Sequence, residues 1–427
     1  MSFFLLTSYS CHKEEDIILN SDGAIVKQPA LWSTSLSKDK LLSYNMGVSI
    51  IYDNQVLTMG AEAGLKGGIS ISGVGNDYLL MKDLTDGRDL WKWDDQWSTA
   101  ESGDIPFVYQ YNQYLTYTNG SRIYGIDLST GQTLWKKQDM EQYDLRPLGL
   151  GTSYFVTADI KDDNPYWEYA IFEGDMRTGK QELVVYPKYQ SLYKAKPGPV
   201  FKYCHLAMPF LQNQDTLLSI VYQEVFEPAP PYPYTDRVQN YLALYNKTQK
   251  AWVYDRIVFT EPGVSEVLDG VPILSDGLIY HSINRTITCH EVLTGKLVWK
   301  RTFGGNFLFS GFIKVGNKIL ANNEGTYLYA LNAQTGGDLW QVKSPGTCTR
   351  MQELNGVVYY VGGGDGLLYA VDSDTGTVYW KIVSPDKKSD SRAFFYNMCS
   401  VAPGINGGKG KVIVSSGLNA FCYEAVR

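Results

Sequence analysis

The strongest constraint on the fold is a stretch of sequence that occurs twice. Residues 328–340 read LYALNAQTGGDLW, and residues 368–380 read LYAVDSDTGTVYW. Each copy reads as a strand, a tight turn at Thr-Gly and the start of a second strand that ends on Trp. Two such similar copies, about 40 residues apart, indicate a repeat protein.

The same turn recurs along most of the chain as Asp-x-x-Thr-Gly with Trp four residues after the Gly. The Gly position falls at residues 87, 131, 179, 249, 295, 336 and 376. In the third unit Leu183 takes the place of Trp, and in the fourth unit Gln249 takes the place of Gly, with Trp252 one residue early. A period of about 40 to 50 residues made of strands and turns is typical of a β-propeller.

An eighth unit is split between the two ends of the chain. Residues 420–426 align with an inner strand of the repeat, and residues 30–36 resemble the missing strand that carries Trp. We therefore predict an all-β fold, an eight-bladed β-propeller of four-stranded antiparallel blades, in a single domain over residues 30–427. The N-terminal strand 30–36 would join the C-terminal blade and close the ring, which removes free sheet edges.

The repeat resembles the PQQ-like (pyrroloquinoline quinone) propeller repeats, whose consensus is Leu-Tyr-Ala-Leu-Asp-x-x-Thr-Gly-x-x-x-Trp. The resemblance covers nearly all of residues 30–427 and is strongest from 270 to 382. It implies that the Trp of each unit docks between neighbouring blades, on a Gly-bearing stretch, so that these side chains are structural rather than an aromatic ligand box. The side chains concerned are Trp32, Trp91, Trp135, Trp299, Trp340 and Trp380.

The N-terminus has features of an export signal. Residues 1–10 contain the short apolar run Phe3 to Leu6, and Cys11 follows small residues. We expect a lipoprotein signal segment at 1–10, lipidation of Cys11 and a flexible tether over 11–29. The alternative is a charged N-terminal tail without a lipid.

The composition and charge of the chain argue against several classes of protein. The formal net charge is -7 and the pI is about 5.3, which argues against a nucleic-acid partner. No apolar run approaches the roughly 20 residues of a membrane span. The cysteines after Cys11 are odd in number and form no CxxC pair, so we expect neither a disulfide framework nor a zinc site, and at most a bridge or two. They are Cys204, Cys289, Cys348, Cys399 and Cys422.

No catalytic motif is present in the sequence. It has no GxSxG, HExxH or Walker loop, and only four His. Cys289 and His290 are neighbours on a predicted strand, so their side chains point to opposite faces and cannot simply share one ion. The quinoprotein dehydrogenases that this repeat resembles carry an adjacent Cys-Cys pair, which is absent here. We expect no catalytic, cofactor-binding or metal-binding residues.

The interval from 179 to 249 is the best candidate for a binding surface. Residues 225–237 are rich in Pro, which cannot donate to a strand ladder, and are predicted to form a projecting loop insertion. Phe226, Tyr232 and Tyr234 would offer flat contact area, and Tyr166 with Trp167 would do so in a second, shorter loop. The alternative is an insertion that only packs against blade edges.

These observations predict a non-catalytic, monomeric propeller that binds a protein partner. It would be anchored by lipid to a bacterial outer membrane, on the periplasmic side or the cell surface. It is similar to the propeller lipoproteins of the outer-membrane β-barrel assembly machinery, which have eight such blades and no quinone. The alternatives are a surface carbohydrate-binding or carbohydrate-processing propeller and, less favoured, a quinone-dependent oxidoreductase.

Overall fold

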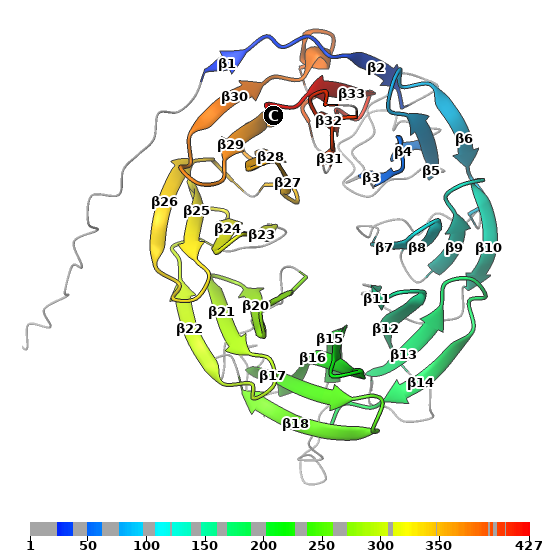
Figure 1. The fold of residues 1–427 in the computed structure, drawn as a ribbon, viewed down its shortest axis with the longest axis vertical. Helices are drawn as coiled ribbons and strands as arrows, with labels where there is room; N and C mark the ends of the chain where they lie inside the picture. The colour runs from blue at the N-terminus through cyan, green and yellow to red at the C-terminus, as the bar shows by residue number, and fades with distance from the viewer. Residues whose placement is uncertain are drawn as a thin grey trace, which may run out of the picture.

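A computed structural model of the chain shows eight β-sheets arranged in a ring (Figure 1). The predicted eight-bladed all-β propeller is confirmed. We number the blades I to VIII in chain order. The structure describes residues 24–36, 49–61, 77–96, 107–119, 122–137, 147–159, 169–188, 202–226, 237–258, 271–305, 311–346, 348–391, 393–395, 399–405 and 407–427.

The first four blades run from the innermost to the outermost strand in chain order. Blade I contains β3 (Ser49–Tyr52), β4 (Gln55–Ala61), β5 (Asp77–Asp83) and β6 (Asp89–Trp93). Blade II contains β7 (Val108–Tyr111), β8 (Tyr114–Asn119), β9 (Arg122–Asp127) and β10 (Gln132–Lys137). Blade III contains β11 (Leu148–Leu150), β12 (Ser153–Asp159), β13 (Tyr169–Asp175) and β14 (Gln181–Val185). Blade IV contains β15 (Lys202–Gln212), β16 (Asp215–Phe226), β17 (Arg237–Asn246) and β18 (Ala251–Val258).

The next three blades follow the same order, and the last is assembled from both ends of the chain. Blade V contains β19 (Ile273–Ser275), β20 (Leu278–Ile283), β21 (Thr286–Glu291) and β22 (Leu297–Thr302). Blade VI contains β23 (Phe312–Val315), β24 (Lys318–Asn322), β25 (Tyr327–Asn332) and β26 (Asp338–Lys343). Blade VII contains β27 (Gln352–Leu354), β28 (Val357–Val361), β29 (Leu368–Asp372) and β30 (Val378–Ile382), with β1 (Ile25–Val26) at its edge. A 3-10 turn, η1 (Pro385–Lys388), leads to blade VIII, which contains β31 (Ser400–Ala402), β32 (Lys411–Ser415), β33 (Asn419–Glu424) and β2 (Trp32–Ser35).

The tight hairpins follow from the dipeptides at their tips. Asn355 and Gly356, between β27 and β28, have φ of 51° and 78°, and Asp276 and Gly277 have φ of 55° and 75°. Two successive positive φ values are the signature of the turn that suits the twist of a β-hairpin, and Asn-Gly and Asp-Gly favour it. These dipeptides therefore form the turns of the β27–β28 and β19–β20 hairpins.

The ring closes as the sequence predicted. β2 pairs antiparallel with β33, with Trp32 opposite Cys422 and Ser35 opposite Asn419. Further backbone hydrogen bonds extend the ladder at both ends, from Leu31 N to Cys422 O and from Leu36 N to Leu418 O. β2, which precedes blade I in the chain, thus supplies the outermost strand of blade VIII.

The hydrophobic core lies between blades rather than within them. One cluster, for example, joins Leu57 and Met81 of blade I to Leu115 and Tyr124 of blade II. Alternate side chains of a strand point to opposite faces, so each blade contributes one face to each neighbouring joint. The faces where adjacent blades meet therefore decide whether the ring is stable.

The N-terminal residues 24–29 lie against the ring, although the sequence suggested a tether for this segment. β1 runs parallel to β30, with Ile25 opposite Lys381 and Val26 opposite Ile382. The signal segment and Cys11 lie outside the described residues. In the part of the chain that the structure describes, no helix is long and apolar enough to cross a membrane.

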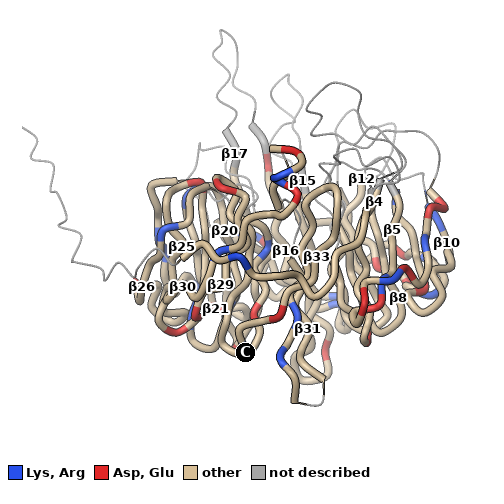
Figure 2. Tube along the Cα trace, turned by 90° about the horizontal axis from the view of Figure 1, so that it is seen from above, with Lys and Arg blue, Asp and Glu red and all other residues tan. Residues whose placement is uncertain are grey.

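Blade IV differs from the others in strand length. β16 has 12 residues and β15 has 11, whereas described strands of other blades have at most seven. At roughly 3.3 Å per residue, β16 spans about 40 Å. Figure 2 shows β15 and β17 standing above the neighbouring blades on one face of the ring.

Candidate interaction surface on blade IV

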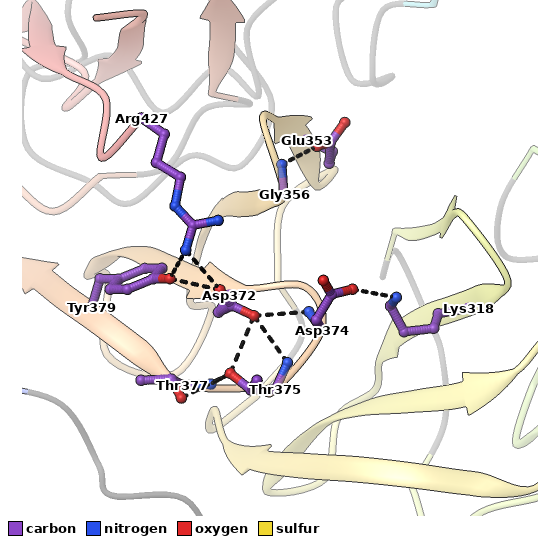
Figure 3. A network of polar contacts seen from close by, with 9 residues as sticks. All are labelled: Lys318, Glu353, Gly356, Asp372, Asp374, Thr375, Thr377, Tyr379 and Arg427. Carbon is purple, nitrogen blue, oxygen red and sulfur yellow. Dashed lines mark hydrogen bonds and ion pairs between the residues drawn. The ribbon is translucent and has the colours of Figure 1, made fainter.

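The repeated turn is built around its first residue, which is an Asp or Asn in most blades and Glu291 in blade V. In blade VII the Asp372 Oδ1 atom accepts hydrogen bonds from the backbone N–H groups of Asp374 and Thr375, both at 2.9 Å (Figure 3). Such side-chain acceptors favour Asp and Asn at the start of a turn. The turn ends on Gly376, whose φ of 71° lies in the left-handed region.

Tryptophan side chains join one blade to the turn of the next. The Trp135 Nε1–H of blade II donates to the carbonyl oxygen of Met176 in blade III, at 2.7 Å. A Cβ atom on Gly179 would lie 2.5 Å from the ring of Trp135, so this contact needs a glycine. Trp32, Trp91 and Trp299 make the same hydrogen bond to Leu84, Leu128 and Ala333 in the blade that follows each of them. These four side chains are joints between blades and do not line a ligand site.

Two further tryptophans lie in inter-blade cores. Trp340 of blade VI is buried against Val371 and Val378 of blade VII. Trp380 of blade VII is buried in a cluster with Phe421 and Tyr423 of blade VIII. Their indoles, too, are used to pack neighbouring blades together.

The register of the turn in blade IV differs from the sequence prediction by one residue. Lys250, not Gln249, takes the glycine position and has a φ of 54°. Tyr254, not Trp252, takes the tryptophan position, and its hydroxyl donates to the Val292 carbonyl oxygen of blade V at 2.8 Å. Aligning Asn246 with the Asp of the other turns would have given this register, because Lys250 and Tyr254 then fall at the Gly and Trp places.

The joint between blades III and IV has no aromatic donor at the tryptophan position. Leu183 occupies that place and is 48% exposed. At the turn the contact is an ion pair, in which Lys247 of blade IV lies 2.5 Å from Glu173 of blade III. An apolar cluster that includes Ile171 and Leu218 joins the same two blades. Lys188, which follows β14, also reaches blade IV and pairs with Asp255 at 2.7 Å.

Above this joint, β16, β17 and β18 form a cluster of aromatic and charged side chains. The rings of Tyr222 and Tyr241 stack with centroids 5.2 Å apart. The Arg256 guanidinium lies over the Tyr241 ring, 4.0 Å from its centroid. It also forks onto Glu224, with N–O distances of 2.8 and 3.0 Å. This bidentate arrangement fixes the orientation of both side chains.

The ion pair of this cluster is partly removed from solvent. Glu224 is only 2% exposed. Burial lowers the pKa of the Arg256 guanidinium, but the hydrogen bonds and charge of Glu224 outweigh burial and raise that pKa. The pair therefore links β18 to β16 at the base of the projecting strands.

The opposite face of the β16–β17 hairpin is polar next to the Tyr222 and Tyr241 pair. Gln223 Nε2 donates to Asn240 Oδ1 at 3.1 Å, and both residues are buried. Cross-strand pairing brings them together, because Gln223 stands opposite Asn240 in the ladder. Polar contacts on both faces thus hold the base of the projection in one register.

The residues predicted as a contact surface lie beyond this base. Phe226 is the last residue of β16, and its side chain is outside the described residues. Tyr232, Tyr234, Tyr166 and Trp167 also lie outside them. The sequence did not single out Glu224 and Arg256, since 32 residues separate them and no local motif connects them.

The neighbours Cys289 and His290 do not point to a common site. Cys289 stands opposite Tyr280 and His290 opposite Ile279, so the two side chains use different faces of β21. Over the described ranges, no three His, Cys, Asp or Glu side chains are placed to hold an ion. The five described cysteines are free and buried. Burial raises the pKa of the Cys289 thiol to about 12, which leaves it unreactive.

The repeat and the ring define the fold as an eight-bladed β-propeller whose repeats resemble PQQ-like repeats. Residues 246–426 match the family sequence model described as outer membrane protein assembly factor BamB. None of the curated proteins matches the chain.

Solved structures share the ring at low sequence identity. BamB from Moraxella catarrhalis is 13% identical with a TM-score of 0.54, covering 94% of this chain and 100% of that one. The quinohemoprotein alcohol dehydrogenase from Comamonas testosteroni is 10% identical with a TM-score of 0.59, covering 93% of this chain and 76% of that one. Sqt1 from Saccharomyces cerevisiae is 9% identical with a TM-score of 0.60, covering 94% of this chain and 100% of that one. These similarities show the fold alone.

Proposed function

We propose that this protein is a non-catalytic scaffold that binds a protein partner at the bacterial outer membrane and takes part in outer-membrane protein assembly. The observation that carries the proposal is the match of residues 246–426 to the family of an outer membrane protein assembly factor. The likeness to BamB over its full length is consistent with it. Lipidation of Cys11 would hold the scaffold at the membrane.

We place the partner surface on blade IV. Its strands extend past the rest of the ring, and long strands on a rigid scaffold offer both contact area and fixed geometry. The Arg256–Glu224 pair and the stacked Tyr222 and Tyr241 hold the base of this projection. Phe226, Tyr232 and Tyr234 are the aromatic residues that we assign to the contact itself.

A binding experiment tests the blade IV surface. Residues 227–236 would be replaced by Asn-Gly, which joins β16 to β17 through a two-residue hairpin turn. We expect binding to the barrel subunit of the assembly machinery, measured by surface plasmon resonance, to weaken at least about tenfold, because aromatic anchors dominate interfaces.

The matched control is Leu339→Ser on blade VI, where an apolar side chain is also exposed but far from blade IV. This variant should bind like the wild type, and both variants should keep the wild-type Tm. Unchanged binding after the loop replacement would contradict the assignment to blade IV. No binding by the wild type, together with glycan-array signals lost in Tyr232→Ala and Tyr234→Ala, would support a carbohydrate-binding propeller instead.

The membrane anchor is tested separately. Cys11→Ala should move the protein from the membrane fraction to the soluble fraction, measured by fractionation and immunoblotting. Ser10→Ala, which leaves the cysteine in place, is the control. Retention of Cys11→Ala in the membrane fraction would show that lipid on this residue does not hold the protein there.

A further inference from the structure

Residues 24–36 form a short segment that contacts three blades. Trp32 pairs with blade VIII through β33 and donates its Nε1–H to the Leu84 carbonyl oxygen of blade I, at 3.0 Å. Leu36 is buried, and its carbonyl oxygen accepts a hydrogen bond from Tyr78 Oη of blade I at 2.8 Å. The segment therefore carries the joint between blades VIII and I.

The same segment also covers the joint between blades VII and VIII. β1 adds to β30 of blade VII, and Gln28 Nε2 donates to the Glu424 carbonyl oxygen of blade VIII at 3.0 Å. Val26 and Ala30 pack on the apolar cluster shared by these two blades. One short segment thus supplies both β1, at the edge of blade VII, and β2, the outermost strand of blade VIII.

The rest of blade VIII is held to blade VII without this segment. Arg427, the last residue, donates to Asp372 Oδ2 of blade VII at 3.1 Å and contacts the Tyr379 hydroxyl (Figure 3). The backbone N–H of Val426 donates to Tyr359 Oη of blade VII at 2.8 Å. Beneath these contacts, Val412 and Tyr423 pack on Trp380.

Blade VIII also touches blade I without the segment. Ser400 Oγ, at the start of β31, donates to Ser49 Oγ of β3 at 2.6 Å. Lys411 of β32 reaches the carbonyl oxygen of Leu84, which also accepts from Trp32. Contacts on both sides therefore hold β31, β32 and β33 in place as a preformed three-stranded acceptor with one open edge.

We propose that residues 24–36 are an exchangeable strand, and that the same segment from a second copy of this chain can replace them in the ring. The acceptor is the edge of β33, which sets the register of the incoming strand. The Trp32 ring packs on Gly87 beside this edge, so the acceptor also selects a tryptophan at that position of the strand. Exchange of an identical element between copies keeps every native contact and is an accessible route to dimers. This inference is independent of the proposed function.

Cleavage of the full chain tests the proposal. The recognition sequence of a specific protease would be inserted between Leu36 and Ser49, and the folded protein would be cut there. We expect the N-terminal fragment to co-elute with the ring in size-exclusion chromatography. Mixing cut copies labelled with 15N and unlabelled cut copies should give hybrid masses in native mass spectrometry.

Synthetic peptides of residues 24–36 identify the contact that drives uptake. A fluorescent wild-type peptide should bind the cut ring, measured by anisotropy. The peptide carrying Trp32→Ala should bind at least about a hundredfold more weakly, since a buried Trp is lost. The control peptide carries Leu31→Ala at a side chain that is 53% exposed, and should bind within about twofold of the wild type.

Two results would overturn the proposal. One is a cut ring that keeps its fragment but forms no hybrid and takes up no peptide. The other is a cut ring that loses its fragment and does not take up the peptide. An uncut chain with a lowered Tm would show a damaging insertion, and intact copies then provide the test: heating and cooling at high concentration should give a dimer that the Trp32→Ala chain does not form, and the absence of that dimer would also overturn the proposal.

Discussion

Joint V–VI and joint III–IV occupy equivalent places in the ring but are built from different chemistry. In joint V–VI, Trp299 lies on Gly336 and donates to the Ala333 carbonyl oxygen at 2.8 Å. In joint III–IV, an exposed Leu183 stands in place of the tryptophan, and Lys247 reaches back to Glu173. Both joints keep an apolar cluster between the blades, but at the turn the first joint uses a buried Trp and the second an ion pair at a partly solvated site.

This difference shows that the tryptophan contact of the repeat is absent from the turn at which blade IV meets blade III. Charged contacts that are partly exposed contribute little to stability, so the turn contact of joint III–IV should stabilise less than a buried Trp does. Blades III and IV are also joined by an apolar cluster that includes Phe155, Ile171 and Leu218. The Arg256–Glu224 pair lies within blade IV, where it links β18 to β16 and where Glu224 is buried.

The largest effect is expected from removing the aromatic joint. Trp299→Ala should lower the free energy of unfolding by about 4 kcal/mol, because a buried Trp side chain leaves a cavity. Leu183→Ala, at the equivalent place in blade III, should lower it by less than about 0.5 kcal/mol. Urea denaturation measures both. Similar values for the two variants would remove the distinction between the joints.

The ion pair of blade IV should rank second. Arg256→Ala leaves Glu224 buried without its partner and should lower the free energy of unfolding by about 3 kcal/mol. Arg256→Met combined with Glu224→Gln should cost less than Arg256→Ala, since no charge is then left buried. A double variant that is less stable than Arg256→Ala would show that the pair itself, rather than its burial, provides the stability.

The histidines of blade V extend the comparison to pH. The ring centroids of His281 and His290 lie 6.1 Å apart. Burial, with a contribution from His290, lowers the pKa of His281 to about 3, and burial lowers the pKa of His290. The unfolded chain, with a histidine pKa near 6.5, therefore binds more protons below that pH, and stability falls as pH drops through it.

Below pH 6.5, the slope of the free energy of unfolding against pH should be up to about 1.4 kcal/mol per pH unit for each histidine. Replacing His281 with Leu and His290 with Gln should flatten this slope in denaturation measured at a series of pH values. An unchanged slope in the double variant would place the acid sensitivity elsewhere.

The turn of blade IV offers a smaller, stabilising change. Lys250 has a φ of 54°, a conformation that glycine adopts without steric cost. Lys250→Gly should therefore raise the free energy of unfolding by about 0.5 to 1 kcal/mol. Gly316→Ala, at a position with a φ of 56° and open space, should lower it by a similar amount. A destabilised Lys250→Gly variant would mean that the lysine side chain contributes more than the strain removes.

The smallest effect should come from the ion pair at the blade III–IV turn. Lys247→Met should lower the free energy of unfolding by roughly 0.5 kcal/mol at low salt and by less at high salt, because both partners are partly exposed. Denaturation at two salt concentrations measures this difference. A loss comparable to that of Trp299→Ala would show that charge alone can replace the aromatic joint.

The sequence predicted the ring, the number of blades and the closing strand because their signals are local and repeated. A Thr-Gly turn followed by Trp marks each unit, and residues 30–36 lack only the strands that precede such a Trp. The predicted register of the blade IV turn was wrong because the repeat pattern was aligned on Thr248 rather than on Asn246. The Arg256–Glu224 pair and β1 could not be predicted, since one depends on distant positions in one sheet and the other on two residues of parallel pairing.

The closing strand has a consequence for how the chain is made. Gln28 hydrogen-bonds to Glu424, 396 residues further along the chain. Closing a loop of this length costs about 2 kcal/mol more entropy than closing one ten times shorter. Residues 24–36 are therefore synthesised well before the strand with which they pair, by roughly 20 s or more at 5–20 residues per second. Trp32 and blade I are made early, but β2 has no partner until β33 is made, so we expect ring closure to come late in folding.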